Sequence, residues 1–232
     1  RTRMPSTEAT LMDKCMKAWR FLYRRGFIEG FGHISVRLPG TDTYMLTRHS
    51  LGRVIVPDDM LVYDMNGTKL GGNGDRPGEA PIHHEIFRAR PDVNSIIHYH
   101  GMHATAFTTS AEHTLRPIHL MGTLFADGLP IYKDPRLIST TERGTALATA
   151  LGSHRAALLY AHGGVVTGGD IEECVTGAFF LEENAHRAYL SCMLGKPQWI
   201  EPQMAHDAAE ELIRTRGPMR RVWAMVEVEG AE

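Results

Sequence analysis

The chain has 232 residues, 43% of them hydrophobic, which suits one α/β domain over residues 1–232 with a substantial core. A formal net charge of −2 argues against nucleic acid as a bulk electrostatic partner. No run of about 18 apolar residues exists, so no membrane partner is expected. Three well-separated cysteines and the lack of an apolar signal-peptide core at the start favour a cytoplasmic location.

Hydrophobic periodicity predicts a first half that begins with a helix and continues with short strands. The expected elements are a helix over 6–25, strands over 34–38 and 44–47, an extended segment over 54–63 and a tight hairpin at 65–69. The hairpin is expected because Asn66-Gly67 is a dipeptide that favours tight turns.

In the second half, predicted helices and strands alternate. The expected elements are helices over 80–90, 102–109, 140–151 and 170–193, and strands over 96–100, 130–132, 156–160 and 164–167. The tail over 205–215 and 222–228 carries no clear pattern. Interleaved elements with hairpin signals between residues 33 and 70 predict an α/β/α sandwich around a mixed, largely antiparallel sheet.

His98-Tyr99-His100 is the most informative short motif of the chain. Side chains two apart on a strand point the same way, and the apolar lead-in predicts a buried strand that ends at these imidazoles. A third histidine, His162, could arrive from a second strand and complete a three-nitrogen face. Three protein ligands and an open position suit a catalytic divalent metal. The alternative is that these are scattered histidines, since the chain contains 13.

Four blocks of sequence, spread over roughly residues 10–195, resemble the class II aldolase/adducin family in their order and content. The blocks are Gly30–Arg37 (GFGHISVR), Arg76–Val93 (RPGEAPIHHEIFRARPDV), His98–His100 (HYH) and Ala161–Gly169 (AHGGVVTGG). The resemblance implies the fold predicted above, a small-molecule substrate, and a homo-oligomer that is a tetramer or a multiple of one.

The resemblance also implies a metal centre with one divalent ion per subunit. His98, His100 and His162 match the family's three imidazole ligands. Glu79 matches an acidic residue that serves as a fourth ligand or as a general acid/base. Mn²⁺ is favoured, although neutral imidazole suits Zn²⁺ and Fe²⁺ equally. The alternative for Glu79 is a helix-start residue stabilised by the helix dipole.

Three further residues near these motifs are singled out. His83 lies one helical turn after Glu79 and is interpreted as a structural or supporting residue, whereas His84 is expected to be partly exposed. Tyr132 occupies the region where some family aldolases place a proton-donating tyrosine, and a buried strand tyrosine is the alternative.

The sequence departs from the family's sugar-phosphate aldolases where those enzymes bind phosphate. His33 replaces an asparagine, Pro77 and Gly78 replace two serines, and a Ser-Gly turn has become His49–Arg53 (HSLGR). These changes remove small polar donors that suit phosphate. Arg53, with His49 and Ser50, is predicted to bind a planar substrate carboxylate instead. The alternative for Arg53 is a solvated loop charge.

The Gly-His-Ile-Ser-Val-Arg segment resembles the family branch that decarboxylates hydroxylated aromatic or pyridine dicarboxylates during aromatic compound degradation. That resemblance implies a metal-dependent lyase in which Glu79 or His33 protonates the ring carbon. The alternatives are an aldolase or epimerase acting on an unphosphorylated hydroxy-carbonyl compound, a non-catalytic adducin-like interaction module, and a non-haem iron oxygenase.

Overall fold

The computed structural model describes residues 7–231, and within them eight strands form one sheet. The strand order is β4-β3-β2-β1-β5-β8-β7-β6. The strands are β1 (His33–Arg37), β2 (Thr43–Thr47), β3 (Met60–Asp64), β4 (Lys69–Gly71), β5 (Ser95–Tyr99), β6 (Ile131–Tyr132), β7 (Ala156–Leu159) and β8 (Gly163–Gly168). Every neighbouring pair is antiparallel except β6 and β7, which are parallel. The predicted mixed, largely antiparallel sheet is therefore confirmed.

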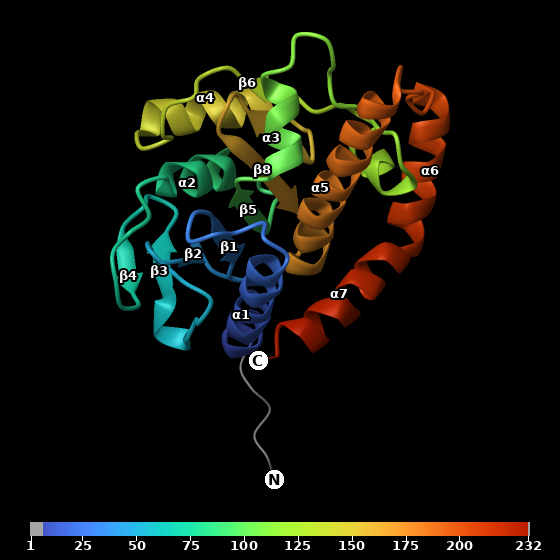
Figure 1. Ribbon diagram of the computed structural model, residues 1–232. Coiled ribbons are helices and arrows are strands. Elements are labelled where there is room, and N and C mark those ends of the chain that lie inside the picture. Colours follow the sequence, from blue (N-terminus) through green and yellow to red (C-terminus); the bar gives the residue numbers. More distant parts are fainter. Residues whose placement is uncertain (1–6, 232) are drawn as a thin grey trace.

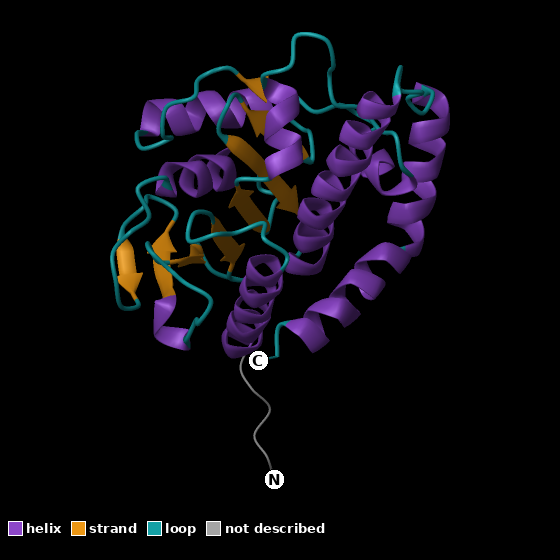
Figure 2. Ribbon diagram, viewed as in Figure 1, coloured by secondary structure: helices purple, strands orange, loops and turns teal. Residues whose placement is uncertain are grey.

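Helices cover both faces of the sheet (Figures 1 and 2). The α-helices are α1 (Thr7–Arg24), α2 (Ala80–Ala89), α3 (Met102–Thr108), α4 (Thr141–Leu151), α5 (Ile171–Leu194), α6 (Pro202–Thr215) and α7 (Gly217–Glu229). Two short 3₁₀ helices are η1 (Pro57–Asp59) and η2 (Leu120–Phe125). The described chain thus forms the predicted α/β/α sandwich.

Alternation of side chains along the strands divides the core into two clusters. On β5, Ile97 and Tyr99 pack with apolar residues of α1 and α5, whereas Ile96 packs with those of α2 and α4. Neighbouring residues of one strand point to opposite faces, so each strand contributes to both clusters. His98 follows the parity of Ile96 and therefore faces the side covered by α2 and α4.

The register of the central strands β1, β5 and β8 determines which residues meet at the candidate site. His33 on β1 pairs with His98 on β5, which in turn pairs with Val165 on β8. His98 and His33 are directly opposite one another, so their imidazoles lie on the same face of the sheet. The residues that follow β5 and precede β8 consequently meet at one end of the sheet.

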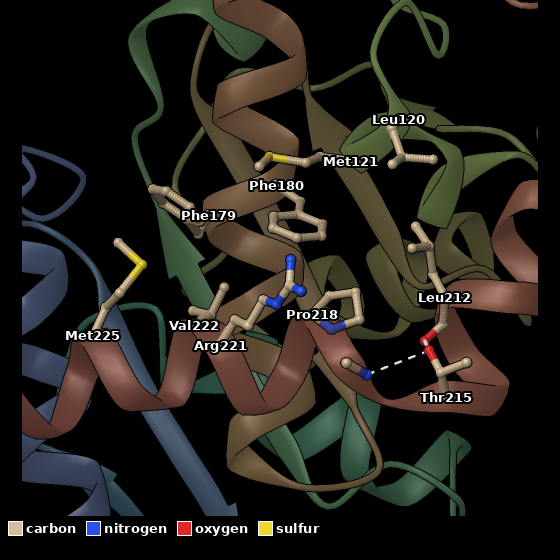
Figure 3. Close-up of a pocket in the computed structure, with 11 residues that line it drawn as sticks. Leu120, Met121, Phe179, Phe180, Leu212, Thr215, Pro218, Arg221, Val222 and Met225 are labelled. Carbon is tan, nitrogen blue, oxygen red and sulfur yellow. Dashed lines mark hydrogen bonds between the residues drawn. The ribbon is translucent and has the colours of Figure 1, made fainter.

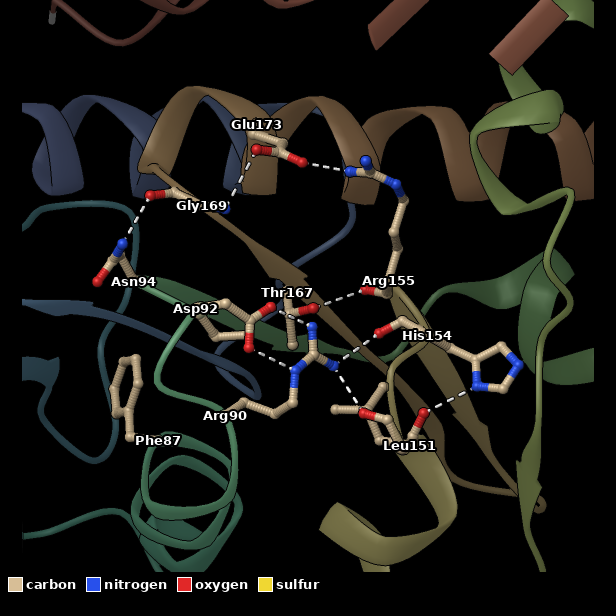
Figure 4. Close-up of polar contacts among 12 residues, drawn as sticks. Phe87, Arg90, Asp92, Asn94, Leu151, His154, Arg155, Thr167, Gly169 and Glu173 are labelled. Atoms are coloured by element: carbon tan, nitrogen blue, oxygen red, sulfur yellow. Dashed lines mark hydrogen bonds and ion pairs between the residues drawn. The ribbon is translucent and has the colours of Figure 1, made fainter. Parts of the chain in front are cut away.

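A polar network lies at the opposite end of the sheet, where β5 begins (Figure 4). The Arg90 side chain, just after α2, pairs with Asp92 at 2.7 Å and donates to the carbonyl oxygens of Gly152 and His154 at 2.7 and 3.2 Å. Nearby, the guanidinium of Arg155, the residue just before β7, pairs with Glu173 of α5. These contacts join the C-terminal ends of α2 and α4 and hold β7 against α5.

Two sequence predictions differ from the structure. In the segment predicted as extended over 54–63, only β3 is a strand, because Pro57 lacks a backbone donor and Asp59 accepts a hydrogen bond from the N–H of Val56 at 2.8 Å, which favours the 3₁₀ turn. The tail that carried no clear pattern forms α6 and α7.

Candidate metal centre

Four side chains from three separate segments meet where β5 ends and β8 begins. His98 is on β5 and His100 follows it, His162 lies in the turn between β7 and β8, and Glu79 is the residue before α2. One ligand atom from each side chain can be chosen so that all four lie within 4.8 Å of one another. The sequence-predicted ligands are therefore brought together.

The three imidazoles surround a common point with the Glu79 carboxylate beside them. Their ring centroids are 5.0 to 5.1 Å apart in every pair. Glu79 Oε2 lies 3.3 Å from Nε2 of His98 and 3.5 Å from Nε2 of His162. Three nitrogens and one carboxylate oxygen form a donor set that divalent transition metals accept.

The hydrogen bonding of the imidazoles fits a metal ion. Nδ1 of His98 donates to the carbonyl oxygen of Gly164 at 3.0 Å, so Nε2 carries the lone pair. The Nε2 atoms of His98, His100 and His162 are buried and have no hydrogen-bond partner in the described chain. Buried polar atoms without partners are costly, and a cation among them would satisfy all three nitrogens.

Electrostatics keep the ligands in the forms that metals bind. Burial, followed by electrostatic repulsion from the neighbouring His98 and His162, lowers the pKa of His100 to about 4 and leaves the imidazole neutral near pH 7. Burial alone would raise the pKa of Glu79, but the adjacent His162 and His98 outweigh it and hold the pKa well below its ordinary value. Glu79 is therefore a carboxylate.

Two further histidines, His33 on β1 and His83 on α2, lie on the β1 side of the four-residue cluster. The His33 ring stacks on His98 with a centroid separation of 5.6 Å, and His83 Nδ1 lies 2.6 Å from the Ser35 hydroxyl. Burial, followed by electrostatic repulsion from the neighbouring His98, lowers the pKa of His33 to about 3. His33 is thus a neutral imidazole beside the cluster, able to donate one N–H hydrogen bond.

The structure places two other predicted residues away from the four-residue cluster. His84 was expected to be partly exposed, and this prediction is wrong, because only 7% of it is exposed. The His84 ring packs against Tyr44 of β2 and Tyr63 of β3. Tyr132 lies in β6 at the edge of the sheet and packs against the apolar cluster under α2 and α4.

The predicted carboxylate-binding residues lie on an exposed loop after β2. Ser50 Oγ lies 2.5 Å from His49 Nδ1, and Trp19 anchors the loop by donating to the Gly52 carbonyl at 2.9 Å. The carbonyl oxygen of Leu51 approaches the segment that leads into His33, 3.9 Å from where a β-carbon at Gly30 would stand. Arg53 is exposed and makes no ion pair or hydrogen bond with residues 7–231.

Two contacts of the site were not foreseen from the sequence. The backbone N–H of Ile138 donates to Glu79 Oε1 at 2.8 Å. Phe31 stacks on His100 with its centroid 5.9 Å away. The first had no sequence signal, because 59 residues separate the partners. The second could have been suspected, since Phe31 stands between two glycines inside a block that resembles the family.

A separate cavity of about 450 Å³ lies between α5, α6, α7 and η2 (Figure 3). Its walls are mostly apolar, with Phe180, Met121 and Val222 among them and the Arg221 guanidinium reaching over it. None of the four metal-centre residues lines it. We therefore assign the candidate active site to the histidine cluster and not to this cavity.

Comparison with known proteins agrees with the geometry. The model of the class II aldolase and adducin N-terminal domain matches residues 13–189. The chain belongs to this family. The resemblance identified from the four sequence blocks is thereby confirmed. None of the helices in residues 7–231 is long and apolar enough to span a membrane.

Several relatives of the chain bear the names of decarboxylases. The chain is 29% identical to the 3,4-dihydroxyphthalate decarboxylase of Arthrobacter keyseri, over 78% of each chain. It is 30% identical to the 3-oxo-tetronate 4-phosphate decarboxylase of Haemophilus influenzae, over 77% of this chain and 87% of the relative. These relatives confirm the expectation of an enzyme rather than an adducin-like binding module.

The fold has close structural counterparts. L-fuculose 1-phosphate aldolase from Glaciozyma antarctica superposes with a TM-score of 0.84, covering 99% of this chain and 93% of the aldolase. Sequence identity in that comparison is 23%, so it bears on the fold alone. The predicted class II aldolase-like sandwich is confirmed.

Proposed function

We propose that this chain is a metal-dependent decarboxylase of an ortho-hydroxylated aromatic or pyridine carboxylate or dicarboxylate. The observation that carries the proposal is the cluster of Glu79, His98, His100 and His162, in which three imidazoles turn unpaired nitrogens toward one point. The decarboxylase relatives support this reaction type.

The three imidazoles would hold the cation, with Glu79 beside it. A divalent ion there supplies a Lewis acid that stabilises negative charge on the substrate as the carboxylate leaves as CO₂. Mn²⁺ is our first candidate, and Zn²⁺ and Fe²⁺ are the alternatives. The neutral state of His100 supports this role, because a protonated imidazole cannot bind a metal.

The loop after β2 is proposed to bind the substrate's carboxylate. The Arg53 guanidinium is exposed and has no partner within residues 7–231, so binding a carboxylate would not require breaking an ion pair in that part of the chain. Arg can donate two parallel hydrogen bonds to such a group. His49 and Ser50 provide further polar atoms on the same loop.

Glu79 is proposed to move the proton. As a carboxylate it can accept the proton of the substrate hydroxyl before the carbon–carbon bond breaks. CO₂ then departs without the bonding pair, which remains on the ring carbon. Glu79 returns its proton to that carbon, so the proton count balances and the carboxylate is regenerated. His33, a neutral imidazole beside the cluster, and Tyr132 are the alternative donors.

Two measurements on one preparation test the proposal. Protein purified without chelator is analysed for metal and then incubated with hydroxylated phthalates and pyridine dicarboxylates. We expect about one divalent ion per chain and CO₂ release that chelation abolishes. Release of an aldehyde from small hydroxy-carbonyl compounds, without CO₂ from any aromatic acid, would replace the proposal with an aldolase.

We further propose that residues 1–232 act as one domain, that the protein works in the cytoplasm, and that it assembles as a homotetramer or a multiple of one. The basis is the family resemblance of the four sequence blocks. Sedimentation equilibrium would measure the oligomeric mass, and a monomeric active enzyme would contradict the expected assembly.

A further inference from the structure

Phe31 stands out among the phenylalanines of this protein. The residue is 67% exposed, whereas Phe27 is half-buried and the other six are buried. The Phe31 ring lies against the ring of His100, with centroids 5.9 Å apart and planes 16° from parallel. A large apolar surface is therefore presented to solvent directly beside a candidate metal ligand.

The backbone around Phe31 explains why the ring stays there. Gly30 and Gly32 have φ values of +80° and +115°, in the region that favours glycine. A β-carbon on Gly32 would stand only 2.8 Å from the carbonyl oxygen of His98. The two glycines thus let the segment lie close against β5, and this approach places Phe31 over His100.

The segment is anchored on both sides of Phe31, so its exposure is not a consequence of a loose loop. Ile28 is fully buried in the core, and His33 begins β1. The carbonyl of Leu51, from the loop that carries Arg53, approaches Gly30. The segment that carries Phe31 consequently lies against the candidate metal centre at Phe31 and against the loop proposed to bind carboxylate at Gly30.

We infer that Phe31 is a specificity-determining residue that selects a planar aromatic ring over a tetrahedral, sugar-like carbon chain. This inference rests on the proposed function, since it takes the substrate to bind at the metal centre. A flat ring can stack on phenylalanine with favourable quadrupole and dispersion contacts, whereas a hydroxylated aliphatic chain would desolvate the phenyl face without that gain.

The test uses two chelators that share one donor pair, and CO₂ is monitored during each titration so that turnover of either one is detected. Salicylate and lactate each carry a hydroxyl and a carboxylate, but only salicylate has a ring. Their affinities for the full-length, Mn²⁺-loaded protein are measured by calorimetry for the wild type, Phe31→Leu, Phe31→Ala and Phe31→Tyr. Leu70→Ala is the matched control, because Leu70 is also an exposed apolar residue but lies on the edge strand β4.

We expect Phe31→Leu and Phe31→Ala to weaken salicylate binding by about tenfold and to change lactate binding by less than about twofold. Phe31→Tyr and Leu70→Ala should keep the wild-type ratio of the two affinities. Metal content and oligomeric mass, measured on each variant first, should match the wild type.

An equal fold-loss for salicylate and lactate, which leaves the ratio of the two affinities unchanged, would overturn the inference. So would a fall in oligomeric mass on substitution without any change in that ratio, because Phe31 would then belong to a subunit interface. The outcome is separable from that of the proposed function. A ring preference that depends on Phe31 without CO₂ release would reject only the decarboxylase, and CO₂ release with no such preference would reject only the role of Phe31.

Discussion

The backbone N–H of Ile138 donates a 2.8 Å hydrogen bond to Oε1 of Glu79. This bond leaves Oε2 as the oxygen that faces His98 and His162. The two oxygens of one carboxylate therefore have different surroundings, and the carboxylate is oriented by a segment 59 residues away in the chain. Oxygen Oε2 is the atom available to a metal ion or to a substrate proton.

Replacing Glu79 with glutamine separates proton transfer from metal binding. Glu79→Gln keeps the size of the side chain and can keep the Ile138 hydrogen bond, but it cannot carry a proton between substrate atoms. We expect most of the metal to remain bound by the three imidazoles. The kcat for CO₂ release should fall by roughly two to four orders of magnitude.

Metal analysis and steady-state kinetics on the same Glu79→Gln preparation measure both effects. If Glu79 were only a helix-start residue, its substitution would cost about 1 kcal/mol of stability or less and leave kcat nearly intact. Near-normal turnover in the fully metallated variant would move the proton-transfer role to His33 or Tyr132.

His100 is expected to bind the metal. Its Nε2 atom is buried and unpaired, and His100→Ala would leave only two imidazoles at the site. Metal content and activity should fall together. His206→Ala is the matched control, since His206 lies on α6 outside the four-residue cluster and is exposed at 45% of its side chain. Full metal occupancy with normal turnover in His100→Ala would remove the three-histidine centre from the mechanism.

Local rules predicted that His98 and His100 act together, whereas His162 and Glu79 were assigned to the metal centre from the family resemblance. Two-residue periodicity placed His98 and His100 together at a strand end, and capping residues predicted helix boundaries. Thr140 illustrates the second point, since its hydroxyl accepts from the N–H of Arg143 at the start of α4, within one residue of the boundary predicted for the helix over 140–151.

Contacts between distant segments could not be predicted in this way. The Ile138–Glu79 hydrogen bond uses a backbone N–H, which every residue except proline possesses, so no residue type signals it. His84 was misjudged for a related reason. Its neighbours Tyr44 and Tyr63 come from β2 and β3, and only the packing of α2 on the sheet shows that they enclose it.

Gly163 provides a way to perturb the metal centre without removing a ligand. A β-carbon there would stand 2.5 Å from the carbonyl oxygen of Tyr99 and 2.9 Å from Cδ2 of His100. Gly163→Ala must therefore displace β5 or the imidazole. We expect metal affinity to fall by about 10- to 100-fold, the range seen when groups that orient ligands are altered.

Gly164→Ala is the control for Gly163→Ala. Its added carbon would make contacts of 3.7 Å or more, and the backbone carbonyl that accepts from His98 would remain. Competition with a fluorescent chelator measures both affinities. Equal affinities in the two alanine variants would show that the approach of Gly163 to His100 does not matter for metal binding.

Sugar phosphates are expected to be poor ligands. His33 is a buried neutral imidazole, and Pro77 offers no backbone donor where the family's phosphate-binding enzymes have small polar residues. Calorimetry with fuculose- or ribulose-type phosphates should give no saturable binding at millimolar concentration. Tight binding of either phosphate would contradict the prediction and favour an aldolase.

Stability should depend on pH through His84. Burial, followed by the charge of Arg88, lowers the pKa of this imidazole to about 4, against an ordinary value of 6.5. Between these values the unfolded chain binds more protons than the folded one, so stability falls as the pH is lowered through this window. From pH 7.5 to pH 5 the contribution of His84 should decrease by about 2 kcal/mol.

His84→Phe keeps a ring between Tyr44 and Tyr63 but does not titrate. Urea unfolding of both proteins at the two pH values, with chelator present, gives the difference attributable to this residue, because the other histidines contribute equally to each. The wild type should lose about 2 kcal/mol more than the variant on acidification. Parallel losses in the two proteins would show that His84 is not held neutral by its buried position.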